Sequence, residues 1–284
     1  MILDGKTFSL KIKDNVKAEV EKLIASGLTP PSLAVVLVGS DAPSQIYVNN
    51  KKNACAYVGI KSVSVELNEN ISQAQLEKKL NDLNNDKSIN GILLQLPLPK
   101  GLDERRALNC ISPIKDVDGL TNLSLGKLTS GEQCLTACTP TGIMELLKEY
   151  KVDLCGKHVV IINRSNLVGK PLAQLMLKEN ATVTICHSKT KNLKHFTKHA
   201  DVLVTAVGKN NFITADMIKK DSVIVDVAIV RMPNGICGDV DFENVGKKAK
   251  LITPVPGGVG PLTIATLMQN TVIAYKMQNN MLGE

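Results

Sequence analysis

The chain has 284 residues and a mass of 30.6 kDa, with 44% hydrophobic residues, 21% charged residues, 3% aromatic residues and a formal net charge of +7. This composition is ordinary for a globular protein and excludes fibrous and disordered classes, while the length favours two domains over one. The lysines are spread along the chain and few aromatic rings are available to stack on bases. We therefore expect no nucleic-acid partner.

The sequence also argues against membranes, disulfides and metals. Its apolar runs, such as Leu33 to Val38, are too short to cross a bilayer, so we expect a cytoplasmic protein with no membrane partner. The seven cysteines are scattered without a Cys-x-x-Cys pair, which indicates reduced thiols. His195 and His199 are one helical turn apart but lie among lysines, so a solvated helix face is favoured over a metal site.

Helices and strands are predicted to alternate along the first half of the chain. The residue after a loop at 39–43, Ser44, is a plausible N-cap. Alternation at these spacings indicates a parallel α/β sheet. The predicted helices are 14–26, 44–57 and 72–83, and the predicted strands are 33–38, 61–67 and 91–96.

The second half repeats this alternation after residues 112–138, a segment with little periodicity. A helix from Thr139 and Pro140 to Tyr150 opens it, and a helix at 261–277 closes it. The fold class is therefore α/β with two domains, 1–138 completed by 261–284, and a Rossmann-like domain at 139–260, with ligands expected in the cleft between them. The predicted strands of the second half are 158–163, 182–187, 202–207 and 223–227.

The stretch from Val159 to Pro171 reads as a strand, a tight loop and the start of a helix. Backbone N–H groups and the helix dipole at such a turn favour an anion, and a dinucleotide is the usual guest. The loop is not a standard G-x-G-x-x-G, because Asn163 stands where the first glycine would be and only Gly169 is clearly glycine-like in role. Asn163 is permissible there because asparagine tolerates the left-handed conformation that a tight turn can need.

The residues after the second strand of this half indicate which dinucleotide is bound. An NAD site usually has a carboxylate there, whereas this strand ends in Cys186-His187-Ser188-Lys189. Ser188 and Lys189, with Arg164 in the loop, would instead meet the 2′-phosphate of NADP. Surface polar residues with no such role are the alternative.

Tyr47 and Lys51 are four residues apart on a predicted helix and therefore share a face. A lysine beside an aromatic hydroxyl in a partly dry site can have a pKa low enough for proton transfer. An exposed helix gives the same spacing by chance. Short-chain dehydrogenases also use Tyr-x-x-x-Lys, but there the pair follows the nucleotide loop, whereas here it precedes the loop by more than a hundred residues.

Six motifs occur in a fixed order along nearly the whole chain. Together they closely resemble the bifunctional methylenetetrahydrofolate dehydrogenase/cyclohydrolase (FolD) family, with Q-L-P-L-P and P-G-G-V-G-P the most specific. The motifs are Ser44-x-x-Tyr47-x-x-x-Lys51, Gln95-Leu96-Pro97-Leu98-Pro99, Lys115-Asp116-Val117-Asp118-Gly119, Cys138-Thr139-Pro140-x-Gly142, Arg164-Ser165-x-x-Val168-Gly169-x-Pro171 and Pro254-Val255-Pro256-Gly257-Gly258-Val259-Gly260-Pro261.

The resemblance implies two reactions on a folate substrate. The protein would oxidise 5,10-methylenetetrahydrofolate to the methenyl form with NADP, by hydride transfer that mainly needs positioning, and then hydrolyse it to 10-formyltetrahydrofolate, which needs proton transfer. The implied catalytic residues are Lys51 for the proton, Gln95 to orient Lys51, Tyr47 against the folate ring and Asp118 on the pterin edge. Substrate contacts would include Ser44 and the Pro256-Gly257-Gly258 loop, and cofactor contacts Asn163, Arg164, Ser165, Ser188 and the backbone of Ile229.

The sequence departs from the family pattern at three positions, Ala137, Asn163 and Ala228, where proline, glycine and glycine are common. The last two lie near the expected cofactor and bear on its affinity. The resemblance also implies a homodimer, through the cofactor domain, and the alternatives are a dehydrogenase-only folate enzyme that prefers NAD and a basic nucleic-acid-binding module.

Overall fold

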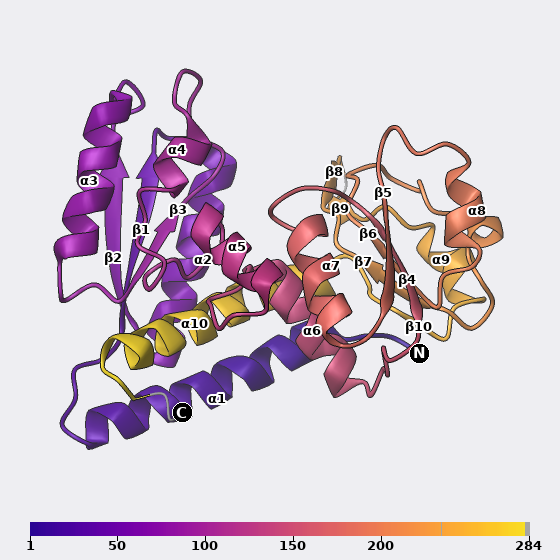
Figure 1. Cartoon of the computed structure of the whole chain (residues 1–284), viewed down its shortest axis with the longest axis horizontal. Helices are drawn as coiled ribbons and strands as arrows, with labels where there is room; N and C mark the ends of the chain where they lie inside the picture. The colour runs from indigo at the N-terminus through magenta and orange to yellow at the C-terminus, as the bar shows by residue number, and fades with distance from the viewer. Residues whose placement is uncertain (234, 282–284) are drawn as a thin grey trace. The chain divides into compact units, whose positions relative to one another are not determined.

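The computed structural model describes residues 1–233 and 235–281, which form two compact units (Figure 1). The three-stranded unit comprises residues 10–138 and 264–281, and the five-stranded unit comprises residues 1–9 and 139–263. The first nine residues thus belong to the unit formed by the second half of the chain. No helix of the described part of the chain has the length and apolar character needed to span a bilayer.

The three-stranded unit is built on a parallel sheet in the order β2-β1-β3. The central strand β1 (Ser32–Val38) is buried along its whole length, which explains its continuous apolar sequence. One of its faces, with Ala34, Val36 and Val38, packs in a core with α3. The neighbouring elements are α2 (Ala42–Val58), β2 (Lys61–Leu67), α3 (Gln73–Asn85) and β3 (Gly91–Leu94).

Three helices within residues 1–138 depart from the sequence-based expectations. The first, α1 (Gly5–Ala25), begins nine residues earlier than predicted. Two short helices, α4 (Glu104–Leu108) and α5 (Asn122–Ser130), lie where no helix was predicted, and side chains of Asp103 and Thr121 cap them. The final helix of the chain, α10 (Val259–Gln278), agrees with the predicted helix at 261–277.

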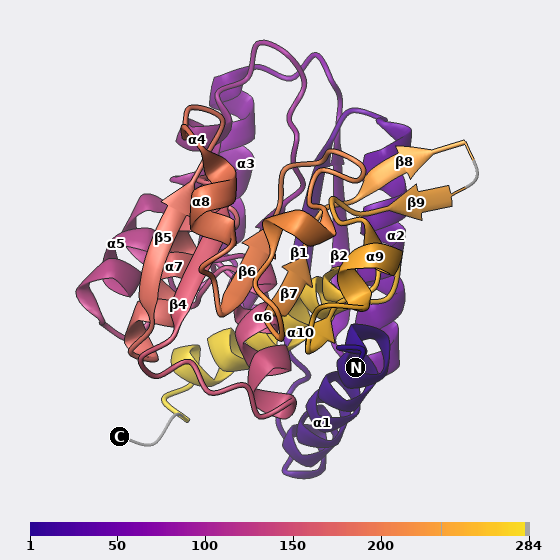
Figure 2. The same cartoon turned by 90° about the vertical axis from the view of Figure 1, so that its right-hand side faces the viewer.

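The five-stranded unit holds an all-parallel sheet in the order β10-β7-β6-β4-β5. The predicted strands of the second half are all present, and an antiparallel hairpin, β8 with β9, was not predicted (Figure 2). The strands are β4 (His158–Ile162), β5 (Thr182–Cys186), β6 (Val202–Thr205), β7 (Val223–Asp226), β8 (Val230–Met232), β9 (Gly235–Cys237) and β10 (Leu251–Ile252), and the helices are α6 (Cys138–Glu149), α7 (Gly169–Lys178), α8 (Leu193–Thr197), the 3₁₀ helix η1 (Ala215–Met217) and α9 (Phe242–Gly246).

Two predicted N-caps are wrong. Asp41, rather than Ser44, caps α2, because its carboxylate accepts hydrogen bonds from the Ser44 N–H at 3.0 Å and the Ser44 hydroxyl at 2.8 Å. Thr139 lies inside α6, which begins at Cys138, and its hydroxyl hydrogen-bonds to Thr263 instead of capping the helix. In both cases the side chain oxygen has a partner other than the orphan N–H groups of the first turn.

Candidate functional site

Lys51 and Gln95 meet in the three-stranded unit although they are 44 residues apart. The Nζ atom of Lys51, on α2, donates to Oε1 of Gln95 at 2.8 Å. Gln95 follows β3, and its own Nε2 donates to Leu96 O at 2.7 Å, so the amide is held with its oxygen toward the lysine. Burial lowers the pKa of Lys51, and the nearby Asp118 opposes that shift. The arrangement favours a lysine that can lose its proton more easily than an exposed one.

The turn that carries Asp118 is stabilised by Asp116, a neighbour in the Lys115–Gly119 motif. Asp116 is buried and its carboxylate accepts from Leu120 N at 3.1 Å, Thr121 N at 2.8 Å and Ser124 Oγ at 2.7 Å. Gly119 has a φ of +63°, and a Cβ there would lie 2.5 Å from the Ala137 nitrogen, so only glycine fits this turn. The motif is therefore a tight turn with a fixed conformation, and it carries one half-buried carboxylate, Asp118.

Loss of water on burial is the main influence on the pKa of Asp118. Burial raises the pKa of Asp118, Lys51 lowers it and Asp116 raises it further. The same loss of water therefore disfavours the charged forms of both Lys51 and Asp118.

Cys138 and Asn270 complete this polar cluster and were not assigned a role from the sequence. The Cys138 thiol donates to Val117 O at 3.3 Å, and burial, followed by the charge of Asp118, raises the pKa of the thiol well above its ordinary value. Asn270, on α10, donates to Val117 O at 2.8 Å and Thr136 O at 2.9 Å. No local motif marks Asn270, because its partners lie more than 130 residues away in the chain.

Tyr47 and Ser44 lie on the first turns of α2, on the amino-terminal side of Lys51. Tyr47 is 39% exposed, which leaves its ring available to a ligand. Ser44 is buried and its hydroxyl donates to Asp41, so the hydroxyl helps to fix the start of the helix. The structure thus brings Lys51, Gln95 and Asp118 together and places Tyr47 one turn away from Lys51.

The loop from Pro256 to Gly258 lies in the five-stranded unit and is fixed by the start of α1. Lys6 N donates to Gly257 O at 2.8 Å. A Cβ on Gly5 would lie 1.9 Å from Gly258 O, and Gly257 has a φ of +101°. The close approach explains the glycine at position 5, and the positive φ explains Gly257. At Gly258 a Cβ would lie 2.5 Å from Pro254 O, so a side chain does not fit there either.

All of the expected cofactor residues follow strand ends on one edge of the five-stranded sheet. In the register, Ile162 pairs with both Cys186 and Thr205, and Thr205 pairs with Asp226. The segments after β4, β5, β6 and β7 therefore leave the sheet at the same level. Asn163, Arg164, Ser165, Ser188 and Ile229 all lie in these segments. Ligands of open parallel sheets bind at this carboxyl edge.

Asn163 replaces a glycine by using its side chain and not its backbone. It is absent from the residues with positive φ, so the left-handed conformation that was allowed for it is not used. Its Oδ1 accepts from Ser165 N at 2.8 Å, Ser165 Oγ at 2.7 Å and Gly169 N at 3.1 Å. A Cβ on Gly169 would lie 2.1 Å from Asn163 O, which explains the glycine at that position. The loop is thus tied together by one amide oxygen.

The end of β5 carries basic and hydroxyl groups and no carboxylate. Ser188 and Lys189 are exposed there, as is Arg164 after β4. Ile229, after β7, is 44% exposed. These free cationic and hydroxyl groups fit a nucleotide that carries an extra phosphate, and the loop and N-terminus of α7 fit its pyrophosphate.

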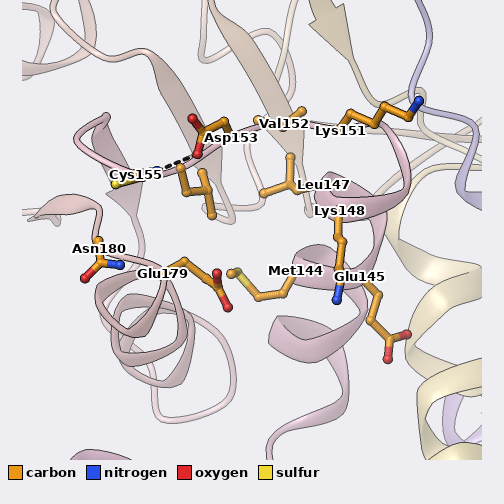
Figure 3. Close-up of a pocket in the computed structure, with 11 residues that line it drawn as sticks. Met144, Glu145, Leu147, Lys148, Lys151, Val152, Asp153, Cys155, Glu179 and Asn180 are labelled. Atoms are coloured by element: carbon orange, nitrogen blue, oxygen red, sulfur yellow. Dashed lines mark hydrogen bonds between the residues drawn. The ribbon is translucent and has the colours of Figure 1, made fainter.

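A surface hollow of about 490 Å³ lies elsewhere in the five-stranded unit (Figure 3). Its lining includes Leu154 and Cys155, which precede β4, and Asn180, which precedes β5. The hollow is therefore at the amino ends of the strands, opposite the edge where a dinucleotide is expected.

In the described part of the chain no three His, Cys, Asp or Glu side chains gather as a metal site would require. The ring centroids of His195 and His199 lie 5.2 Å apart.

Two family models cover most of the chain. The catalytic domain of tetrahydrofolate dehydrogenase/cyclohydrolase matches residues 3–118, and the NAD(P)-binding domain of the same family matches residues 137–279. This chain belongs to the tetrahydrofolate dehydrogenase/cyclohydrolase family. Its second half is therefore the family's NAD(P)-binding domain, which agrees with the strand ends described above.

Individual relatives are similar over nearly their full length. The bifunctional protein FolD of Halalkalibacterium halodurans is 50% identical over 276 residues, 97% of this chain and 99% of that protein. The crystal structure of the bifunctional FolD enzyme of Campylobacter jejuni has a TM-score of 0.96 at 47% identity and covers 99% of both chains. The Trypanosoma brucei dehydrogenase-cyclohydrolase complexed with NADP and an inhibitor has a TM-score of 0.93 at 34% identity, with 98% of this chain and 97% of that chain covered.

These findings confirm the family that the motifs predicted, the two-domain α/β fold and the nicotinamide dinucleotide cofactor. The protein is a bifunctional enzyme that oxidises 5,10-methylenetetrahydrofolate to the methenyl form and hydrolyses the methenyl form to 10-formyltetrahydrofolate. Its substrate is a folate.

Proposed function

We propose that Lys51 carries the proton of the hydrolysis step and that NADP is the hydride acceptor of the oxidation step. The observation that supports the first part is the 2.8 Å hydrogen bond from Lys51 Nζ to an amide oxygen that is itself fixed through Leu96. An amide oxygen does not take up the lysine proton, and burial lowers the pKa of Lys51, so the neutral amine is accessible.

In the hydrolysis step, a water oxygen bonds to the cationic methenyl carbon and passes a proton to the neutral Lys51 amine. The resulting ammonium then protonates the folate ring nitrogen as its bond to that carbon breaks, and the new hydroxyl loses its proton to become the formyl oxygen. One proton is released overall. Gln95 keeps the amine in one orientation through both transfers, which is where general acid–base catalysis gains its rate.

In the same proposal Asp118 accepts hydrogen bonds from the pterin amino group and ring nitrogen, and Tyr47 packs against the folate ring. Ser44 and, separately, Pro256, Gly257 and Gly258 are the other proposed folate contacts. NADP, when bound, supplies the carbon that takes the hydride. The chain's part in that step is positioning.

For the cofactor, Asn163, Ser165 and the N-terminus of α7 would hold the pyrophosphate. Arg164 and Ser188 would meet the 2′-phosphate, and the backbone of Ile229 would contact the cofactor. The lack of a carboxylate after β5 supports NADP over NAD.

An assay with methylenetetrahydrofolate tests both parts of the proposal. The purified protein is given NADP or NAD, and the methenyl and formyl products are separated. Faster reduction of NADP with formyl product is expected. A preference for NAD would contradict the Arg164 and Ser188 assignment, and methenyl product that only disappears at its spontaneous rate would indicate a dehydrogenase-only enzyme.

We also propose that the enzyme is a homodimer formed through the five-stranded unit. Its strand β5 is at the edge of the sheet, and Ile185 on it is 38% exposed. An exposed edge strand pairs readily with a second copy. Sedimentation of the wild type and Ile185→Lys should give a dimer and a monomer; a monomeric wild type would contradict the proposal. The cytoplasmic location and the absence of a nucleic-acid partner stay predictions.

A further inference from the structure

The loop that follows β6, residues 206–209, is held by one buried carboxylate. Asp239 has no exposed surface, and its two oxygens accept four hydrogen bonds. The donors are Thr205 Oγ1 at 2.7 Å and Val207 N at 2.6 Å on Oδ2, and Gly208 N at 2.8 Å and Lys209 N at 2.7 Å on Oδ1. Three successive backbone N–H groups of this kind form a pocket that binds anions, and here a side chain fills it.

This loop lies at the point in the parallel sheet where the order in which strands are added reverses. From β4, the chain adds β5 on one side and then returns to add β6 on the other. In open parallel sheets the ligand crevice forms between the loops that leave two such strands at their carboxyl ends. The loop after β6 is therefore one wall of the expected cofactor crevice, and the loop after β4 is the other.

The two walls are connected by hydrogen bonds. Asn163 Nδ2 donates to Ala206 O at 2.7 Å. The other end of the same amide, Oδ1, gathers Ser165 and Gly169 in the phosphate loop. A continuous path thus runs from Asp239, through residues 206–209, to Asn163 and the phosphate loop.

Asp239 is itself fixed from two sides. Its carbonyl oxygen accepts from Ile213 N at 3.0 Å. On the next residue, Val240 N donates to Asp226 Oδ2 at 2.9 Å, and a Cβ on the preceding Gly238 would lie 2.0 Å from that same oxygen. The carboxylate of Asp239 therefore has little freedom to leave the loop that it holds.

We propose that Asp239 is a positioning residue for the dehydrogenase, which fixes the loop after β6 and, through Asn163, the phosphate loop, so that both walls are set before a dinucleotide binds. This inference rests on the assignment of the carboxyl edge as the cofactor site. Preorganised loops bind more tightly because less ordering is needed on binding. Hydrolysis of the methenyl substrate uses no dinucleotide, so the effect should be confined to one of the two activities.

The test compares Asp239→Asn with the wild type by calorimetric titration of NADP and by both assays. Asparagine keeps one acceptor oxygen but puts an N–H₂ group against two donors. We expect the Kd and KM for NADP to rise about tenfold, with cyclohydrolase kcat and KM for the methenyl substrate within twofold of the wild type. Asp241→Asn is the matched control, since Asp241 caps α9 two residues away and has no bond to the loop; its NADP affinity should stay unchanged.

A double-mutant cycle with Asn163→Ala tests the connection. If Asp239 acts through Asn163, the double variant should bind NADP only slightly more weakly than the weaker single variant. An unchanged NADP affinity in Asp239→Asn, or equal losses in both activities, would overturn the positioning role. Failure of the cofactor assignment is recognised separately, because then Arg164→Gln would also leave NADP binding unchanged.

Discussion

The two units of this enzyme build their sites by different means. In the mechanism proposed for the three-stranded unit, hydrolysis depends on a side chain that exchanges a proton: Lys51 donates a hydrogen bond to a fixed amide, and burial lowers the pKa of Lys51. In the five-stranded unit the proposed cofactor site depends on backbone loops that accept their conformation from hydrogen bonds to the side chains of Asn163 and Asp239. The difference matches the two reactions, because hydrolysis moves protons and hydride transfer needs a dinucleotide in one position.

Lys51→Met should have the largest effect, and only on hydrolysis. If the side chain carries the proton, the rate of methenyl hydrolysis should fall by about a thousandfold, while the variant still binds NADP with the wild-type Kd. Stopped-flow absorbance of the methenyl substrate measures the first quantity and calorimetry the second. Lys52→Met removes the neighbouring exposed lysine and should change neither. Cyclohydrolase activity retained in Lys51→Met would exclude Lys51 from the mechanism.

The next largest effect is expected for Asp116, which stabilises the turn that carries Asp118. Asp116→Ala leaves two buried N–H groups and one hydroxyl without their acceptor, which should lower the free energy of unfolding by about 3 kcal/mol. Urea denaturation measures the loss, and the KM for folate should rise with NADP affinity unaffected. Asp82→Ala, an exposed carboxylate on α3, should shift stability by less than about 0.5 kcal/mol. Equal stability of the two variants would contradict the structural role.

Arg164→Gln should affect only the dehydrogenase, through the cofactor site of the five-stranded unit. Loss of a charge-assisted bond to the 2′-phosphate should lower kcat/KM for NADP about thirtyfold and that for NAD less than threefold. Cyclohydrolase activity should be unchanged. Lys157→Gln removes a positive charge just before β4, at the opposite edge of the sheet, and is the control. Parallel losses for NADP and NAD would mean that Arg164 does not contact the 2′-phosphate.

Ser188→Ala should give the smallest effect, about a fivefold rise in the KM for NADP, because one neutral hydrogen bond to the phosphate is removed. The KM for NAD should not change. Steady-state kinetics with both cofactors measure the ratio, and a wild-type ratio would place Ser188 outside the site.

The sequence was sufficient for much of the fold, because strands such as β1 and β4 are continuous apolar runs and the motifs follow their ends. It was insufficient where long-range contacts decide. The early start of α1 depends on Gly5 and Lys6 meeting Gly257 and Gly258.

The site shows the same limit. Lys51 and Gln95 could be proposed from the sequence because their motifs occur together with the others, and the structure places the two side chains in hydrogen-bond contact. Asp239 was missed because it follows the loop that it holds by about 30 residues and no local pattern marks it. Asn163 was placed correctly in the loop, but its mode of action, through the side chain, depends on where Ala206 and Gly169 lie in space.

Proton transfer by Lys51 is tested most directly by the pH dependence of the cyclohydrolase rate in the wild type and in Gln95→Glu. The rate of Lys51→Met is subtracted as background. Hydrolysis needs the neutral amine, so the wild-type rate should rise with pH and level off with a midpoint below 10.5, the ordinary value for lysine. In Gln95→Glu a carboxylate beside the ammonium raises the pKa of Lys51, and the midpoint should move up by about one pH unit. A wild-type midpoint at the ordinary value, or the same profile in both proteins, would contradict proton transfer by a lysine whose charge the site controls.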